Sequence, residues 1–237
     1  TIATFIGERR AYKKGKIERE EKYSRYIDKK REEIEIARQD EKEYLEKMYF
    51  SKQQEYGLVR DFSSNLFGCK VGDIDFLHLN LGVGRKETLR KIEYKEREQL
   101  EIEDELTLIP EQLANEYRYI SEVPITCDLQ KDNIVGIVGD DFHMQELVKN
   151  IIVDICVRHY HTDVRLIIIA DEKNSEYVKW ARYIPHLNNE HTRNIVCDEE
   201  SRNSVFEFMY KLFSEREDNK SKLPHYVVLA LSHMGIK

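Results

Sequence analysis

A glycine-containing segment in the second half of the chain carries the residues with the clearest chemical potential. It begins at Gly136, reads Gly139-Asp140-Asp141 in its middle and reaches Gln145. A glycine loop between a strand and a helix is where an α/β protein binds phosphate, because the helix amides and dipole favour an anion. Gly136, Gly139, Asp140, Asp141 and Gln145 are therefore the candidate nucleotide-binding positions.

The same segment lacks the groups that ATP hydrolysis requires. A P-loop, GxxxxGK[ST], needs a lysine that reaches the phosphates and a hydroxyl that holds Mg²⁺, and neither follows Gly139. Asp140 and Asp141 place carboxylates where phosphate charge would lie, and the apolar run at 227–231 ends without an acidic residue. No catalytic residue is predicted, and ATP affinity is expected to be weak or absent. A metal site at the two aspartates is less favoured than a solvated helix cap.

Cysteine, histidine and overall charge point away from metal and nucleic-acid chemistry. The four cysteines show no CxxC spacing and the eight histidines are dispersed, so no metal site and no disulfide framework are predicted. The formal net charge of −7 argues against a broad nucleic-acid footprint, so no nucleic-acid partner is expected.

The elements that must position the glycine segment follow an α/β pattern. Short apolar runs alternate with amphipathic stretches, which predicts a right-handed parallel sheet. Strands are expected over 134–138, 164–170, 195–197 and 226–231, and helices over 142–160, 174–182 and 201–213. Upstream, residues 76–81 are expected to form a strand that ends at the turn 82–84, and Pro110 is expected to start a helix.

Residues 8–56 predict one long, exposed helix. They contain no proline and only one glycine, Gly15, and about half of them are charged with both signs interleaved. A heptad seam through this stretch includes Lys30 and Glu41, so an autonomous coiled coil is not expected. The helix is expected to lean on a partner helix or on its own domain.

The beginning of the chain reads like the cytoplasmic end of a membrane span. A short apolar run is followed at once by Arg9, Arg10, Lys13, Lys14 and Lys16, and the chain has no initiator Met. These basic residues are expected to lie against anionic headgroups, in a fragment that begins just after a span. The alternative is a frayed terminus followed by a solvated helix face.

Five blocks of sequence carry a resemblance to a known family. They are LFGCKVGDIDFLHLNLGVG, VPITCDLQKDNIVGIVGD, DVRLIIIAD, WARYIPHLNNE and LPHYVVLALSH. Together they resemble the membrane-proximal part of the FtsK/SpoIIIE-like ATPases of type VII secretion, most specifically at 75–84 and 180–187. In that family, two transmembrane helices lead into a charged stalk helix, a degenerate ATPase-like domain and further ATPase modules.

The resemblance implies an architecture and a role. It implies an α/β, P-loop-NTPase-like domain with a parallel sheet behind a stalk helix, divided into 1–56, a connecting region 57–122, and an incomplete domain 123–237. The expected role is to couple membrane helices to downstream ATPase modules, which would hold ATP and Mg, for export of small helical WXG-type substrates. The alternatives are an active P-loop ATPase module and a DNA translocase.

The same resemblance implies partners and a location. The expected partners are other membrane components of the secretion system, the downstream modules and inner-leaflet lipid, at the cytoplasmic face of the bacterial cell membrane. A homo-oligomer is compatible with this arrangement, and no cofactor is expected in the chain itself.

Overall fold

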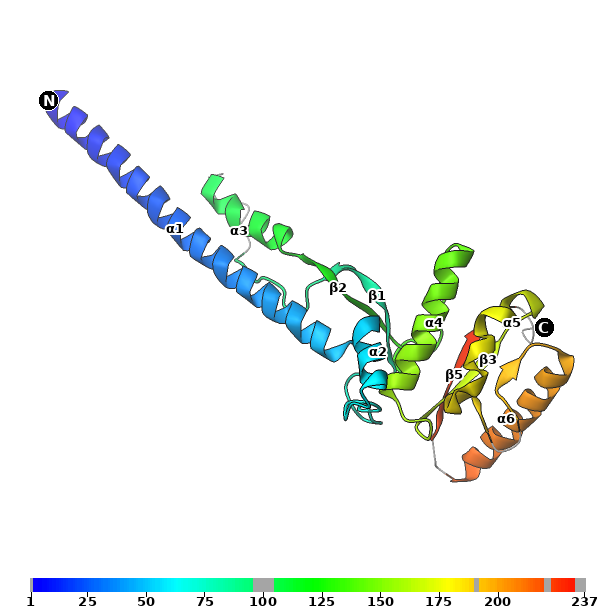
Figure 1. The fold of residues 1–237 in the computed structure, drawn as a ribbon. Coiled ribbons are helices and arrows are strands. Elements are labelled where there is room, and N and C mark those ends of the chain that lie inside the picture. The colour runs from blue at the N-terminus through cyan, green and yellow to red at the C-terminus, as the bar shows by residue number, and fades with distance from the viewer. Residues whose placement is uncertain (1, 96–104, 190–191, 220–222, 233–237) are drawn as a thin grey trace. The chain divides into compact units, whose positions relative to one another are not determined.

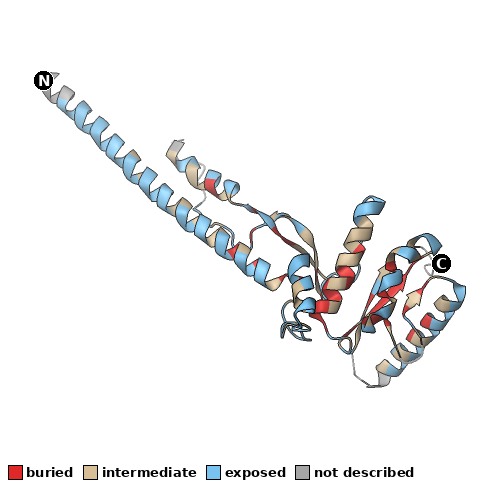
Figure 2. Cartoon of the chain, viewed as in Figure 1, coloured by how far each residue is buried: buried red, intermediate tan, exposed pale blue. Residues whose placement is uncertain are grey.

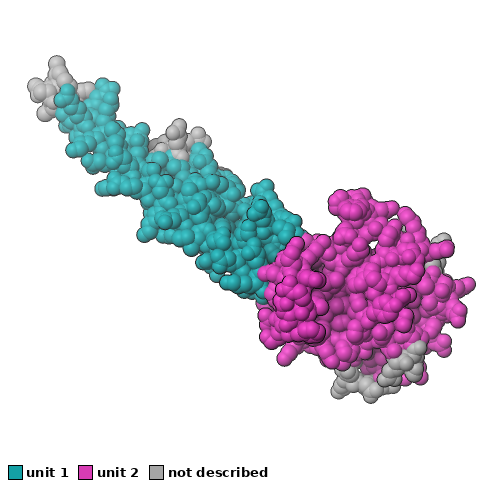
Figure 3. Space-filling model, in the orientation of Figure 1, with its two compact units in different colours: residues 1–48, 83–125 teal, residues 49–82, 126–237 magenta. Residues whose placement is uncertain are grey.

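The α/β class, the long N-terminal helix and the parallel sheet are confirmed by the structure (Figure 1). The computed structural model describes residues 2–95, 105–189, 192–219 and 223–232. Contacts divide the chain into two compact units (Figure 3). Unit 1 comprises residues 1–48 and 83–125, and unit 2 comprises residues 49–82 and 126–237.

Helix α1 (Ile2–Met48) is one continuous helix of 47 residues. The stretch from residue 7 to residue 19 is exposed throughout, as the pale blue ribbon of Figure 2 shows. The predicted helix is confirmed, but it ends at Met48 because a capping box at Ser51 starts a second helix, α2 (Lys52–Arg60). The Ser51 hydroxyl accepts from the Gln54 amide, and the Gln54 side chain accepts from the Ser51 amide.

Unit 1 also contains α3 (Glu105–Glu116). Pro110 lies inside this helix, so the prediction that it starts a helix is wrong. A proline removes one main-chain hydrogen bond of the helix but does not prevent the preceding residues from adopting helical geometry.

Strands β1 (His78–Glu87) and β2 (Tyr119–Asp128) form a two-stranded sheet. The expected turn at 82–84 is wrong, since β1 continues through both glycines to Glu87. Gly82 adopts a φ of +137°, and a Cβ at Gly84 would lie 2.9 Å from Cγ1 of Ile125. The glycines therefore permit a kink and a close approach of the strands rather than a chain reversal.

The core of unit 2 is a three-stranded parallel sheet in the order β4-β3-β5. Its members are β3 (Val164–Ile169), β4 (Ile195–Val196) and β5 (His225–Ala230). The flanking helices are α4 (Asp141–Arg158), α5 (Glu172–Val178) and α6 (Glu199–Asn219), with 3₁₀ turns at Lys179–Tyr183 and Pro185–Leu187. These elements confirm the predicted strands and helices from residue 142 onward, with shifted ends.

Strand β3 is buried on both faces, as its continuous apolar sequence predicts. Leu166 and Ile168 belong to the core cluster that contains Ile152 of α4. Ile167 and Ile169 belong to a second cluster, which contains residues of α6. The alternation of side chains along β3 thus gives the sheet one helix layer on each side.

The predicted strand at 134–138 is wrong, because the structure places this segment in coil. Ile134 is 93% exposed and Val138 is 100% exposed. No strand in the described part of the chain pairs with it, and an extended segment without a partner leaves its main-chain groups to water. The P-loop-like character of the fold therefore stays a prediction.

Candidate functional site

The N-terminus of α4, where a phosphate would sit, is capped by the chain itself. Asp140 is the N-cap residue, and its Oδ1 accepts from the His143 amide at 3.1 Å. Its Oδ2 lies 2.6 Å from His143 Nδ1. The bonds from the His143 amide and ring lower the pKa of Asp140, so a carboxylate is held where a phosphate oxygen would otherwise accept the same amide.

The second aspartate of the segment pairs with a lysine that the glycine motif did not reveal. Nζ of Lys173, on α5, lies 3.1 Å from Oδ2 of Asp141. Both side chains are exposed, so the pair contributes little to stability but balances the charge of Asp141. Lys173 is the second residue of α5, and nothing in the sequence indicated that this position would pair with a residue of α4.

The other three predicted positions do not complete a phosphate cradle. Gly136 lies in exposed coil, and a Cβ there would contact nothing within 4 Å. A Cβ at Gly139 would lie 3.2 Å from the sulfur of Met144, and Gln145 is half-buried in α4. The structure brings Gly139, Asp140 and Asp141 together at the start of α4, whereas Gly136 lies earlier in the coil.

A buried guanidinium at the other end of α4 holds together several segments of unit 2. Arg158 is 3% exposed and donates to the carbonyl of His78 at 2.5 Å and to Oδ2 of Asp75 at 2.5 Å. Its Cζ lies 5.4 Å from the ring centroid of Tyr49, whose hydroxyl is 2.9 Å from His78 Nδ1. Tyr49 directly follows α1, so the first residue of unit 2 after the long helix is held against α4.

The same network contains two carboxyl groups that sequence reasoning missed. Glu55 of α2 and Asp154 of α4 are 3% and 1% exposed, and Asp154 Oδ2 accepts from the Asn80 amide at 3.1 Å. Asn80 also donates from Nδ2 to the carbonyl of Phe50 at 2.9 Å. The available signal was the pair Asp154 and Arg158, spaced i, i+4 within an otherwise apolar helix face.

The histidine beside Arg158 is a core residue. His159 is fully buried, its Nδ1 donates to the Ile155 carbonyl at 3.2 Å, and its Nε2 accepts from the Leu77 amide at 3.2 Å. Burial, and secondarily the charge of Arg158, lowers the pKa of His159 to about 4. His159 is therefore neutral and structural.

Unit 1 holds the second half of α1 through a nearly buried ion pair. Arg38 Nη1 lies 3.2 Å from Oε2 of Glu41, while Nε of Arg38 donates to the carbonyl of Tyr117 and its Nη2 donates to the carbonyl of Arg90. Oε1 of Glu41 accepts from the Leu89 amide at 2.7 Å. These bonds fix α1 to the segment between β1 and α3 and to Tyr117 after α3, and they explain how a charged residue, Glu41, can occupy the expected seam.

The five predicted membrane-surface residues are all exposed on α1. At 100° per residue, Arg9, Arg10, Lys13, Lys14 and Lys16 fall within an arc of about 160° of the helix. We refer to these five residues as the basic collar. Tyr12 and Ile17, beside them, are 75% and 54% exposed. None of the helices in the described part of the chain has both the length and the apolar character to cross a membrane.

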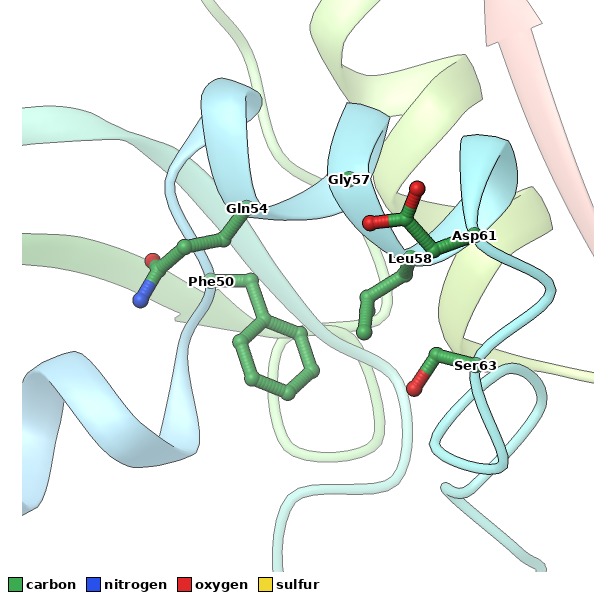
Figure 4. A pocket seen from close by; sticks show the side chains of 6 residues that line it. All are labelled: Phe50, Gln54, Gly57, Leu58, Asp61 and Ser63. Atoms are coloured by element: carbon green, nitrogen blue, oxygen red, sulfur yellow. The ribbon is translucent and has the colours of Figure 1, made fainter.

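Unit 2 has two further features of the kind that can hold a ligand, a surface hollow and a cluster of potential metal ligands. A surface hollow of about 510 Å³ lies beside α2, lined by Phe50, Gln54, Gly57, Leu58, Asp61 and Ser63 (Figure 4). Cys69, Asp73 and Asp75 bring three potential metal ligands within 4.8 Å of one another. Asp75 is already paired with Arg158, and burial raises the pKa of the Cys69 thiol to about 12, so this group is poorly suited to bind a metal.

Comparison with known proteins finds similarity to bacterial secretion system proteins. No protein-family model matches the sequence. The chain is similar to the type VII secretion system protein EssC of Staphylococcus aureus strain MSSA476, with 27% identity over 217 residues, covering 91% of this chain and 15% of that protein. The ESX secretion system protein EccC of Geobacillus thermodenitrificans strain NG80-2 is 23% identical over 237 residues, covering 97% of this chain and 16% of that protein. The chain thus spans about 15% of the length of the EssC relatives that it matches.

Proposed function

Because the chain is homologous to the EssC and EccC proteins of type VII secretion, we propose that it is the membrane-proximal coupling module of a secretion motor. In this proposal, it transmits conformational change between membrane-spanning segments and downstream ATPase modules and hydrolyses no ATP itself. The exported substrates would be small helical proteins of the WXG type.

The observation that carries the proposal is that α1 and the residue that follows it, Tyr49, are each held by buried contacts within their own unit. Within unit 1, Arg38 and Glu41 bind α1 to the main chain around Leu89 and Tyr117. Within unit 2, Tyr49 packs on Arg158 of α4. A helix fixed by buried polar bonds transmits displacement, whereas a solvated tether absorbs it.

The start of α4 supports a role without hydrolysis. Asp140 satisfies the His143 amide, Asp141 pairs with Lys173, and no lysine or hydroxyl stands in the positions that would hold phosphate and Mg²⁺. In this proposal α4 takes the place of the helix that would bind nucleotide in an active module, and its N-terminus is already occupied by the carboxylate of Asp140.

The basic collar supports a location at the cytoplasmic face of the cell membrane. Its five cations lie on one side of α1, with exposed Ile17 among them and exposed Tyr12 beside them, and basic residues mixed with apolar and aromatic ones are typical of a helix that lies against anionic headgroups. The partners in this proposal are inner-leaflet lipid, other membrane components of the secretion system and the downstream modules.

Vesicle binding tests the membrane-proximal placement. Alanine replacements at Arg9, Arg10, Lys13 and Lys14 together are expected to weaken co-sedimentation with anionic phosphatidylserine vesicles by more than tenfold, since each cation contributes about 1 kcal/mol. The control carries four exposed lysines changed elsewhere: Lys29, Lys47, Lys131 and Lys211. Equal loss of binding in both variants would show that net charge, not the collar, drives association, and would refute the placement.

A further inference from the structure

Unit 2 buries more negative than positive charge where α2 meets α4. Glu55 is 3% exposed and Asp154 is 1% exposed, and the two carboxyl groups lie within hydrogen-bonding reach of each other. The nearby cation, Arg158, is engaged with Asp75 at 2.5 Å, and its Nη1 remains 3.9 Å from Asp154 Oδ1. Three carboxyl groups thus face one guanidinium in a region from which water is largely excluded.

One oxygen of this cluster lacks a hydrogen-bond donor. Asp154 Oδ2 accepts from the Asn80 amide, whereas in the described part of the chain no conventional donor lies within bonding distance of Oδ1. A buried carboxylate oxygen without a donor is costly, and native structures rarely leave one. A proton on the neighbouring carboxyl group of Glu55 supplies the missing donor.

We propose that Glu55 and Asp154 share one proton in the folded chain near neutral pH, and that the resulting hydrogen bond fastens α2 to α4. Because α2 begins just after α1, this proton also holds the segment that follows the long helix. The inference concerns the folded chain alone, so it goes beyond the secretion role and does not depend on it.

The charged groups around Glu55 are consistent with a retained proton. Burial and the negative charge of Asp154 raise the pKa of Glu55 to about 8, against the weaker opposing effects of Arg158 and Lys52. Burial also raises the pKa of Asp154, and Asp75 adds to that effect. The other titratable groups nearby are His78, which is held by Tyr49 and faces Asp128, and the thiols of Cys127 and Cys156, whose pKa values are raised by burial and also by Asp154.

The acid pair and two buried histidines have opposite effects on the pH dependence of stability, and together they determine the pH range in which the shared proton can be detected. The folded chain retains the Glu55 proton between its ordinary pKa of 4.5 and about 8, so the stability of unit 2 falls as pH rises through that window. Burial lowers the pKa values of His159 and His186 from 6.5, so their contribution to stability rises as pH rises toward 6.5. Above pH 6.5 the opposing effect of these two histidines declines, and by about pH 7.5 it no longer masks the acid pair.

The first test compares urea unfolding of residues 1–237 at pH 6.5, 7.5 and 8.5. The unfolding equilibrium constant of the original chain is expected to rise severalfold between pH 6.5 and 8.5, by less than tenfold per pH unit, because the histidines offset part of the effect below pH 7.5 and the pH then approaches the pKa of Glu55. Glu55→Gln retains a donor for Asp154 but cannot titrate, so its profile is expected to be much flatter. Glu207→Gln, on an exposed face of α6, serves as the matched control and is expected to keep the original slope. An unchanged slope in Glu55→Gln would overturn the proposal.

A second measurement needs no variant. The ¹³C shifts of the glutamate side-chain carboxyl groups, followed from pH 4 to pH 9, are expected to show one group that titrates well above pH 6. If all glutamate carboxyl groups titrate below pH 6, the shared proton does not exist. This result remains decisive even if the Glu55→Gln chain does not fold.

Discussion

At the residue scale, Asp140 illustrates how one side chain can replace a ligand. Its carboxylate accepts a hydrogen bond from the His143 amide, which a phosphate oxygen would otherwise use. The bonds from the His143 amide and ring also lower the pKa of Asp140 and keep it ionised. A phosphate approaching this helix would meet a fixed negative charge and an amide already in use. The carboxylate of Asp140 therefore stabilises the N-terminus of α4 and opposes the binding of a nucleotide phosphate there.

Removal of this cap tests its structural value. Asp140→Ala is expected to lower the free energy of unfolding by about 1 kcal/mol, because the His143 amide loses its acceptor and the first turn of α4 loses a favourable charge. Urea denaturation monitored by circular dichroism measures the loss. Asp141→Ala, which removes only an exposed pair with Lys173, is the matched control and is expected to cost less than about 0.5 kcal/mol. A larger effect at Asp141 would show that the pair with Lys173, rather than the cap, stabilises this end of α4.

At the scale of elements, the second half of α1 is held by the polar bonds of Arg38 and Glu41. The side chains of this pair are 12% and 4% exposed, so their hydrogen bonds are shielded from water. Charged residues at such positions specify one alignment of α1 along unit 1, since any sliding of the helix would leave them buried and unpaired.

Loss of Arg38 is expected to loosen this alignment. Arg38→Ala leaves the carboxylate of Glu41 without its cation and is expected to destabilise unit 1 by about 3 kcal/mol. In Arg38→Ala, the rate of hydrogen exchange at the Leu89 amide, which donates to Glu41, should increase more than the rates in β3 of unit 2. Lys47→Ala, which removes an exposed pair with Glu43, should leave exchange at Leu89 unchanged. Unchanged protection of Leu89 in Arg38→Ala would mean that packing alone aligns the helix.

The elements that could be predicted from the sequence are those whose periodicity reflects burial. The apolar run of β3 and the amphipathic pattern of α4 led to correct assignments because each records its own burial directly. Residues 134–138 have the same apolar character as β3 but lie in coil, because a strand also needs a neighbour, which local sequence does not reveal. The glycines of β1 were misread for the same reason, since their role depends on Ile125 across the sheet.

The candidate site was predicted only at its local positions. The cap at Asp140 could be foreseen because a helix cap is a local pattern, whereas the nucleotide-binding role of the segment stays a prediction. Glu55, Asp154 and Arg158 were missed because their interaction joins helices far apart in the sequence. Buried charges of this kind are visible in a sequence only as breaks in an apolar face.

At the scale of the whole molecule, the absence of phosphate-binding groups gives a direct prediction about nucleotide. Isothermal calorimetry of residues 1–237 with Mg-ATP is expected to give no saturable binding at micromolar concentrations, because the lysine and hydroxyl of a P-loop are missing. Tight binding that Asp140→Ala alters would contradict the proposed role without hydrolysis. Tight binding that Asp140→Ala leaves unchanged would place a nucleotide site away from α4.

The central claim is that α1 transmits force, and a proline in this helix tests it most directly. In the full-length protein, Ile34→Pro removes a helical hydrogen bond and costs about 3 kcal/mol locally, whereas Ile34→Ala removes the same side chain and keeps the helix. Ile34→Pro is expected to abolish secretion while ATP hydrolysis by the proposed downstream modules persists, and Ile34→Ala is expected to secrete normally. Normal secretion from Ile34→Pro would show that α1 is only a tether and would contradict the coupling role.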